Sequence, residues 1–235
     1  MDKAINLKEE IGRLARKEGA ALCGIALVER YEDYLRETTA RLDETGATGR
    51  AYMLGQDDAH GFFEKLADVR AALPWARSIV LLGVYALDRN SDYRNTRQEL
   101  RGKTARTYAY YPVVRQIAER VAAYLQESGC QAVHGQQIPL KHVASRIGLG
   151  VYGWNGILLT KRFGSYVALR AVLTDAMLEP DHFDPPLFDC KTCGRCVKAC
   201  PTGALFAPYK VDPARCINPL TRTNGELPPE LRRKM

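Results

Sequence analysis

The sequence predicts a mixed α/β (α+β) domain over residues 1–184, followed by a small cysteine-rich module over residues 185–235. Three observations favour this division. Segments with helical periodicity alternate with short apolar runs as far as Asp175. Four of the seven cysteines then fall within residues 190–200. Hydrophobic residues make up 46% of the 235 residues, so the chain can bury a sizeable core without help from a metal.

The elements of the N-terminal half follow from periodicity and from their end signals. Apolar residues recur at helical spacing over Leu7–Ala15, and Gly19 should end that helix. The next apolar run is a predicted strand, in which Cys23 is expected to be a small core residue. A helix before Pro74 should stop at that proline. The run over residues 78–86 is apolar on both faces, which predicts a central strand.

The C-terminal half continues the alternation. An amphipathic helix is expected to begin at Pro112 and to end before Gly129, and a shorter one should follow Pro139. Residues 46–61 and 88–103 are expected to be loops. The expected helices span residues 7–19, 31–45, 68–73, 112–127 and 140–147, and the expected strands span residues 20–28, 78–86, 130–133, 156–160 and 166–174.

Three glycines imitate a dinucleotide-binding motif. Gly148, Gly150 and Gly153 match G-x-G-x-x-G, but that site needs a strand before the glycines and a helix after them. Here a helix is expected before and a strand after, so the order is inverted and no nicotinamide site is assigned. The glycines instead indicate that the backbone comes close to something flat or bulky.

The cysteine run has the spacing C-x2-C-x2-C-x3-C-P, with Cys190, Cys193, Cys196 and Cys200 followed by Pro201. This is the spacing with which bacterial ferredoxins bind a [4Fe–4S] cluster. The first three cysteines are expected on an irregular loop, with their sulfurs at three corners of one cube, while Cys200 points away. A disulfide framework would suit a small secreted chain, and zinc would suit separated pairs or histidine. We therefore expect a ferredoxin-like [4Fe–4S] module.

The net charge of +7 is concentrated near the cysteines, because residues 185–235 carry nine Lys and Arg against four Asp and Glu. An acidic partner, either nucleic acid or a redox protein, would explain this excess. A solvated tail beside an anionic cluster would explain it equally well. No apolar run approaches the ~18–20 residues of a membrane span, and the N-terminus has no apolar signal core. We expect a cytoplasmic protein without a membrane partner.

Motifs along nearly the whole chain, in order, resemble those of the epoxyqueuosine reductase family, which is related to the reductive dehalogenases. The late motifs are specific as a set, although none is specific alone. The matching segments are Ala51-Tyr-Met53, Val69–Val80, Lys141–Gly150, Gly153-Trp-Asn155, Phe163-Gly-Ser165, Leu173-Thr-Asp175, Leu178–Asp181, the cysteine run, Arg215–Thr221 and Gly225–Arg232.

The resemblance implies a corrinoid (cobalamin) in the α/β domain and two [4Fe–4S] clusters that pass electrons to cobalt. It further implies a redox donor protein, a tRNA partner, and reduction of an epoxide on a modified tRNA base, the last step to queuosine. Two other functions stay open: a non-catalytic electron-transfer or corrinoid-handling protein, and a tRNA-binding module. The residues that would lie against the corrinoid are Gly150, Gly153, Trp154, Asn155, Leu158 and Thr160.

The chain departs from the family pattern at two places. The position of the family's proton-donating aspartate is His134, which could donate a proton instead, bind cobalt, or have no role. Trp154 stands where the family tends to have lysine.

The family's second cysteine motif would follow Arg232, and this chain ends before it. Cluster one would then keep three ligands, and cluster two would keep Cys200 and Cys216. Either the chain is truncated, or it holds one cluster whose fourth ligand is Cys216 or, as second choice, Cys200.

Overall fold

The computed structural model describes residues 2–45, 59–87, 106–135, 137–185, 188, 190–212, 215–220 and 229–232. It divides into two compact units assembled from separate segments of the chain. The first unit comprises Met1–Val28, Trp75–Leu149 and Thr160–Pro185, and the second comprises Glu29–Pro74, Gly150–Leu159 and Pro186–Met235. The predicted boundary between residues 184 and 185 stays a prediction. None of the described helices is long and apolar enough to cross a membrane.

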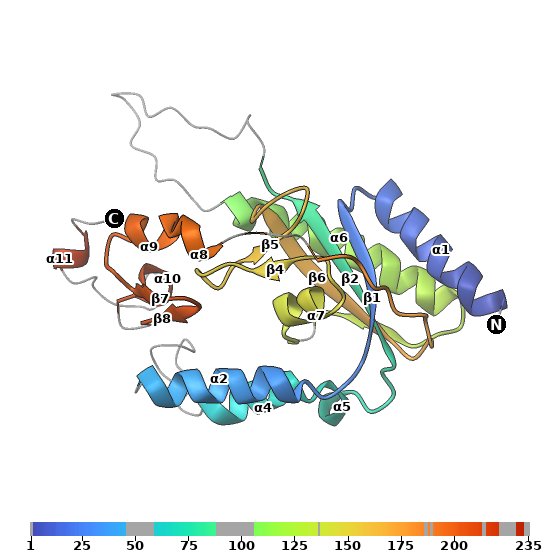
Figure 1. Cartoon of the computed structure of the whole chain (residues 1–235). Coiled ribbons are helices and arrows are strands. Elements are labelled where there is room, and N and C mark those ends of the chain that lie inside the picture. The colour runs from blue at the N-terminus through green and yellow to red at the C-terminus, as the bar shows by residue number, and fades with distance from the viewer. Residues whose placement is uncertain are drawn as a thin grey trace. The chain divides into compact units, whose positions relative to one another are not determined.

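A four-stranded sheet in the order β1-β2-β6-β3 forms the centre of the first unit (Figure 1). Every neighbouring pair in it is antiparallel, so this unit is α+β within the predicted mixed class. The strand predicted to be central, β2, lies inside the sheet, and all its residues except the last are buried. The strands are β1 (Leu22–Leu27), β2 (Ser78–Tyr85), β3 (Ala132–His134) and β6 (Val167–Thr174).

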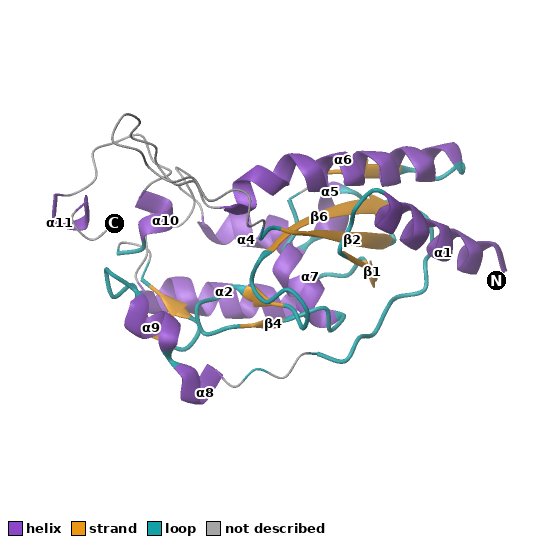
Figure 2. Cartoon of the chain, turned by 90° about the horizontal axis from the view of Figure 1, so that it is seen from above, coloured by secondary structure: helices purple, strands orange, loops and turns teal. Residues whose placement is uncertain are grey.

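Helices lie on both faces of this sheet (Figure 2). Helices α1 (Asp2–Lys17) and α6 (Arg106–Glu127) cover one face, and α7 (Leu140–Arg146) lies on the other. Because side chains alternate along a strand, Val80 and Leu82 of β2 pack with the buried face of α6.

The second unit contains short elements around one helix pair. Helices α2 (Glu32–Thr45) and α4 (Ala59–Ala67) bury Leu42 and Phe63 between them. Asp68 caps the next helix by accepting a hydrogen bond from the N–H of Ala71. The remaining elements of this unit are α5 (Val69–Ala72), β4 (Val151–Tyr152), β5 (Leu158–Leu159), α8 (Cys190–Cys193), α9 (Arg195–Ala199), β7 (Leu205–Ala207), β8 (Lys210–Val211), α10 (Ile217–Leu220) and α11 (Pro229–Arg232).

The predicted order of helices and strands is confirmed as far as β6, with corrections. Helix α6 begins at Arg106 and contains Pro112, because the added turns bring Tyr110 against the core. Residues 59–61, predicted as the end of a loop, begin helix α4, which was not predicted. The elements β4, β7, β8, α10 and α11 were not predicted either, since each is too short for a periodic signal. Cys190–Cys193 is a helical turn and not an irregular loop. The predicted loop over residues 88–103 lies outside the described residues, as do residues 46–58 of the other.

The glycine motif has the inverted order that excludes a dinucleotide site, because α7 precedes it, β4 lies within it, and the strand β5 follows it. Gly148 has a φ of +78°, and a Cβ there would clash with the carbonyl oxygen of Phe183. A Cβ on Gly150 would lie 2.8 Å from the carbonyl oxygen of Leu159. Close approach by the chain's own backbone is therefore sufficient to require these two glycines.

Gly148→Ala should destabilise the protein by roughly 3 kcal/mol or more, because both the left-handed backbone and the clash oppose a Cβ. Gly129→Ala is the matched control: Gly129 has a φ of +86° and nothing within 4 Å of a Cβ. It should cost only about 1–2 kcal/mol. Urea denaturation measures both, and equal losses would show that the contact with Phe183 contributes nothing.

Candidate metal centre and active site

Of the four clustered cysteines, Cys190 and Cys193 lie on α8, Cys196 lies on α9, and Cys200 directly follows α9. Gly194 lies between α8 and α9 and adopts the left-handed conformation (φ 55°). This conformation interrupts the helix between Cys193 and Cys196. Cys200 is extended, as expected for a residue before proline, and helix α9 ends just before it. The Cys193 side chain is exposed, and those of the other three are half-buried.

Several hydrogen-bond donors surround the sulfur of Cys200. Burial acts to raise the pKa of this thiol, but hydrogen bonds from the backbone of Leu205, the side chain and backbone of Thr202 and the backbone of Ala204 outweigh it and lower the pKa to about 7. The Thr202 hydroxyl oxygen lies 3.7 Å from the sulfur. Thiolate is the form that binds iron, so these donors favour a ligand role for Cys200. Thr202 was not among the predicted site residues, and its place two residues after Cys200 is the sequence signal that could have identified it.

The segment that carries Cys216 packs against the turn after Cys200. A Cβ on Gly203 would lie 2.8 Å from a guanidinium nitrogen of Arg215, so the absence of a side chain there makes room for Arg215. The N–H of Asp212 also donates to the carbonyl of Ala204 over 2.8 Å. The structure thus packs together the two segments whose cysteines the resemblance assigns to one cluster.

The thiols suit an iron–sulfur cluster chemically. None of the seven cysteines, all of which lie within the described residues, forms a disulfide. Among the described residues, no three Cys, His, Asp or Glu side chains converge on a single metal ion. A cubane places a different demand on its ligands, because each sulfur binds its own corner. The free thiols and the donors around Cys200 fit such a cluster.

His134 lies at the end of β3, directly opposite Val172, which is itself opposite Val80. This register puts His134 on the sheet face that α6 covers. Its Nε2 atom is 4.0 Å from the Glu119 carboxylate of α6, and its Nδ1 atom is buried without a hydrogen-bond partner among the described residues. A hydrogen bond from Arg115 lowers the pKa of Glu119, and the electrostatic interactions with Arg115, His134 and Arg170 act in the same direction.

The structure does not bring His134 together with the start of the glycine loop. Gly24 lies on the sheet face opposite to that of His134, and a Cβ on it would touch Ile147 (2.9 Å) and Leu149 (3.0 Å). His134 and Ile147–Leu149 therefore lie on opposite faces of one sheet. The role of His134 as a proton donor stays a prediction.

The loop predicted to contact a corrinoid is held by its own hydrogen bonds. The Asn155 side chain accepts from the N–H of Ile157 over 3.1 Å, and the Trp154 carbonyl accepts from the N–H of Tyr209 over 2.9 Å. Leu158 and Thr160 are almost fully buried, whereas Ile157 is 45% exposed and Trp154 is half-buried. The surfaces of Trp154 and Ile157 suit a flat apolar group, and the assignments to Gly150, Gly153, Trp154, Asn155, Leu158 and Thr160 stay predictions.

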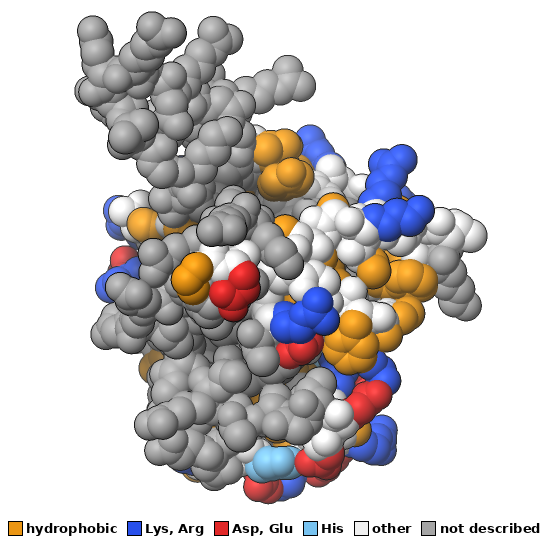
Figure 3. Space-filling model, turned by 90° about the vertical axis from the view of Figure 1, so that its left-hand side faces the viewer, with side chains coloured by type: hydrophobic (Ala, Val, Ile, Leu, Met, Phe, Trp, Pro, Cys, Tyr) orange, Lys and Arg blue, Asp and Glu red, His pale blue; other side chains and the backbone are white. Residues whose placement is uncertain are grey.

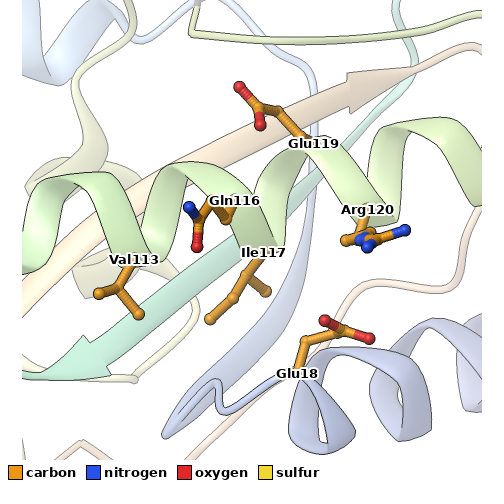
Figure 4. Close-up of a pocket in the computed structure, with 6 residues that line it drawn as sticks. All are labelled: Glu18, Val113, Gln116, Ile117, Glu119 and Arg120. Atoms are coloured by element: carbon orange, nitrogen blue, oxygen red, sulfur yellow. The ribbon is translucent and has the colours of Figure 1, made fainter.

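A cavity of about 480 Å³ lies beside α6 and the end of α1 (Figure 4). It is lined by Glu18, Val113, Gln116, Ile117, Glu119 and Arg120. None of the predicted cofactor-binding residues lines it. We therefore assign no cofactor to this cavity.

The cysteine-bearing end of the chain matches a known family. Residues 189–235 match the family model of a 4Fe-4S double cluster binding domain. The chain is thus an iron–sulfur protein whose cluster-binding segment follows a mixed α/β region.

The whole chain is similar to epoxyqueuosine reductases, which confirms the resemblance. It is 31% identical to the epoxyqueuosine reductase of Bacillus subtilis (strain 168) over 97% of this chain and 59% of that protein. A crystal structure of epoxyqueuosine reductase with an epoxyqueuosine-modified tRNA-Tyr stem loop aligns with a TM-score of 0.82 and 28% identity, over 97% of this chain and 60% of the other. A B12-dependent reductive dehalogenase aligns with a TM-score of 0.54 and 17% identity. The alignment covers 88% of this chain and 28% of the dehalogenase chain, so the two share the fold alone. The chain therefore spans about 60% of the length of these two epoxyqueuosine reductases.

Cys23 should react with iodoacetamide at pH 8 about a hundredfold more slowly than an ordinary thiol, because the thiolate is the nucleophile. Burial raises its pKa to about 11, and the charge of Asp181 adds to this. As the core residue that the sequence predicted, it packs against the buried cluster of the first unit. Mass spectrometry of alkylated peptides measures the rate, and the same cysteine in urea is the control. Equal rates in the two states would contradict the structural role.

Proposed function

We propose that this chain is a corrinoid-dependent iron–sulfur oxidoreductase that reduces an epoxide on a modified tRNA base. The observation that carries the proposal is the similarity to epoxyqueuosine reductases over 97% of the chain, together with the double-cluster domain match. The similarity of folds extends to a structure that holds a tRNA stem loop. A tRNA substrate would place the protein in the cytoplasm.

Electrons would enter through the clusters. Cys190, Cys193 and Cys196 would bind one cluster, and Cys200 and Cys216 would contribute to a second. If only one cluster is present, Cys216 is the proposed fourth ligand and Cys200 the second choice. The exposed side chains of Cys193, Arg195 and Lys198 make this segment accessible and basic, which favours an acidic redox protein as the donor.

The glycine loop would hold the corrinoid, which when bound supplies a strongly reducing cobalt centre. The chain's own contribution would be to orient this group, to exclude water and to provide a proton. Trp154 and Ile157 would make apolar contact with the corrinoid ring. Gly150, Gly153 and Asn155 would let that ring approach the backbone of the loop. His134 is the proposed proton donor, in the position of the family's aspartate.

A second candidate function is electron transfer or corrinoid handling without substrate chemistry. The packing of His134 toward Glu119 beneath α6 favours it, because that environment suits a structural histidine as well as an acid. This candidate predicts reduction of bound corrinoid without turnover of substrate.

Anaerobically purified protein should contain iron and absorb visible light, and Cys196→Ser should lower both. Cys130→Ser is the matched control, since Cys130 packs against the core of the first unit and should leave the iron content unchanged. About eight irons per chain would indicate two cubanes and would rule out the single-cluster version. Colourless, iron-free protein with intact thiols would contradict the proposed metal centre.

His134→Ala should slow product formation by roughly 10²–10⁴-fold, the usual contribution of a general acid, and leave reduction of cobalt unchanged. His134→Asp should restore much of the activity, because aspartate can also donate a proton. Single-turnover assays with separate detection of the cobalt spectrum and of the modified base distinguish the two steps. If product formation survives His134→Ala unchanged, His134 is not the acid.

A further inference from the structure

The turn that leads into β6 is rigid and carries two exposed cations. Thr160 and Gly164 exchange backbone hydrogen bonds of 2.9 and 3.0 Å. The Thr160 hydroxyl donates to the carbonyl of Gly164 over 3.1 Å and accepts from the N–H of Phe163 over 3.2 Å. Thr160 is 1% exposed, whereas Lys161 and Arg162 at the tip are exposed. The turn therefore holds these two cations at a fixed place on the first unit.

An aromatic pair lies beside Arg162, one of these two cations. The Phe163 ring is 5.0 Å from the ring of Tyr85, at an interplanar angle of 37°. The Arg162 guanidinium lies 5.3 Å from the centre of the Phe163 ring. Tyr85 ends β2, where the N–H of Ala86 still bonds to the carbonyl of Tyr166, and 40% of Tyr85 is exposed. We name Tyr85, Lys161, Arg162 and Phe163 the aromatic–basic surface.

The side chains of this surface indicate which class of molecule it binds. Two cations next to an exposed aromatic ring suit a polyanion that also presents a flat, unpaired ring. Single-stranded RNA loops do so, because their bases can leave the stack and lie on aromatic side chains, while a paired duplex hides its base faces. Exposed hydrophobic side chains with Lys and Arg beside them also occur on the face of the molecule drawn in Figure 3.

We propose that the aromatic–basic surface binds the loop of the substrate tRNA, with one unpaired base stacked on Tyr85 and the neighbouring phosphates bound by Lys161 and Arg162. This inference rests on the proposed function for the identity of the RNA. It adds the part of the chain that recognises the loop. Binding at this surface needs neither cluster nor corrinoid, so it is separable from catalysis.

The test is the affinity of the full chain for a fluorescently labelled anticodon stem–loop RNA, measured by anisotropy at several salt concentrations. Tyr85→Ala should weaken binding about fivefold to a hundredfold, the usual effect of losing one stacked base, without changing the salt dependence. Tyr85→Phe should bind like the wild type. The double variant Lys161→Ala/Arg162→Ala should reduce the slope of log affinity against log salt by about 1.4, because two phosphate contacts are lost.

The matched control is Lys17→Ala/Arg120→Ala, which removes two exposed positive charges elsewhere on the first unit. It should leave the affinity close to that of the wild type. Circular dichroism confirms that each variant is folded. If the wild type binds the hairpin and the surface variants bind equally well, this inference is wrong and the proposed function stands. If the wild type does not bind the hairpin at all, both the inference and the proposed tRNA substrate fail. An equal effect of Tyr85→Ala on binding to a fully paired duplex would also overturn the stacking contact.

Discussion

The antiparallel pairing of β2 with β6 is the interaction on which the rest of the first unit depends. It runs from Ser78 opposite Thr174 to Tyr85 opposite Val167. Because side chains alternate along both strands, this one register decides which residues face α6 and which face α7. It directs Val80 and Val172 into the core beneath α6, and through β3 it places His134 on that same face.

The two ends of this strand pair contact different parts of the first unit. At one end the hydroxyl of Ser78 accepts a hydrogen bond from the N–H of Leu178, which begins to fix the segment after β6. Further along that segment the carboxylate of Asp181 accepts from the N–H of Ile25 and pairs with Lys8. At the other end, Tyr85 of β2 and the turn before β6 form the aromatic–basic surface. Hydrogen bonds that fix the segment after β6 thus lie at one end, and the exposed aromatic and basic groups lie at the other.

The cysteine-bearing segment of the second unit is stabilised in a different way, since little of it is buried. Its order there comes from local hydrogen bonds and from two left-handed glycines, Gly194 and Gly203. Donors gather around the sulfur of Cys200, and Arg215 fills the space beside Gly203. Such a segment gains much of its stability from the group that it binds, because ligand thiolates repel one another until iron neutralises them. The cluster would therefore be part of the fold as well as part of the electron path.

The elements whose signals are local could be predicted from the order of the amino acids alone. The periodic helices, the apolar strand at residues 78–86, the inverted order around the glycine motif and the spacing of the cysteines could all be found without a structure, because each depends on neighbouring residues. Short elements such as β4 could not be predicted, because they contain too few residues for a periodic pattern. The start of α6 was wrongly predicted at Pro112, because packing against the core outweighs the local signal of the proline. The folded chain was needed to show which face His134 occupies, that the backbone of Phe183 lies against Gly148, and that the ring of Tyr85 packs on that of Phe163. These facts depend on strand register and on contacts between distant segments, which no local pattern encodes.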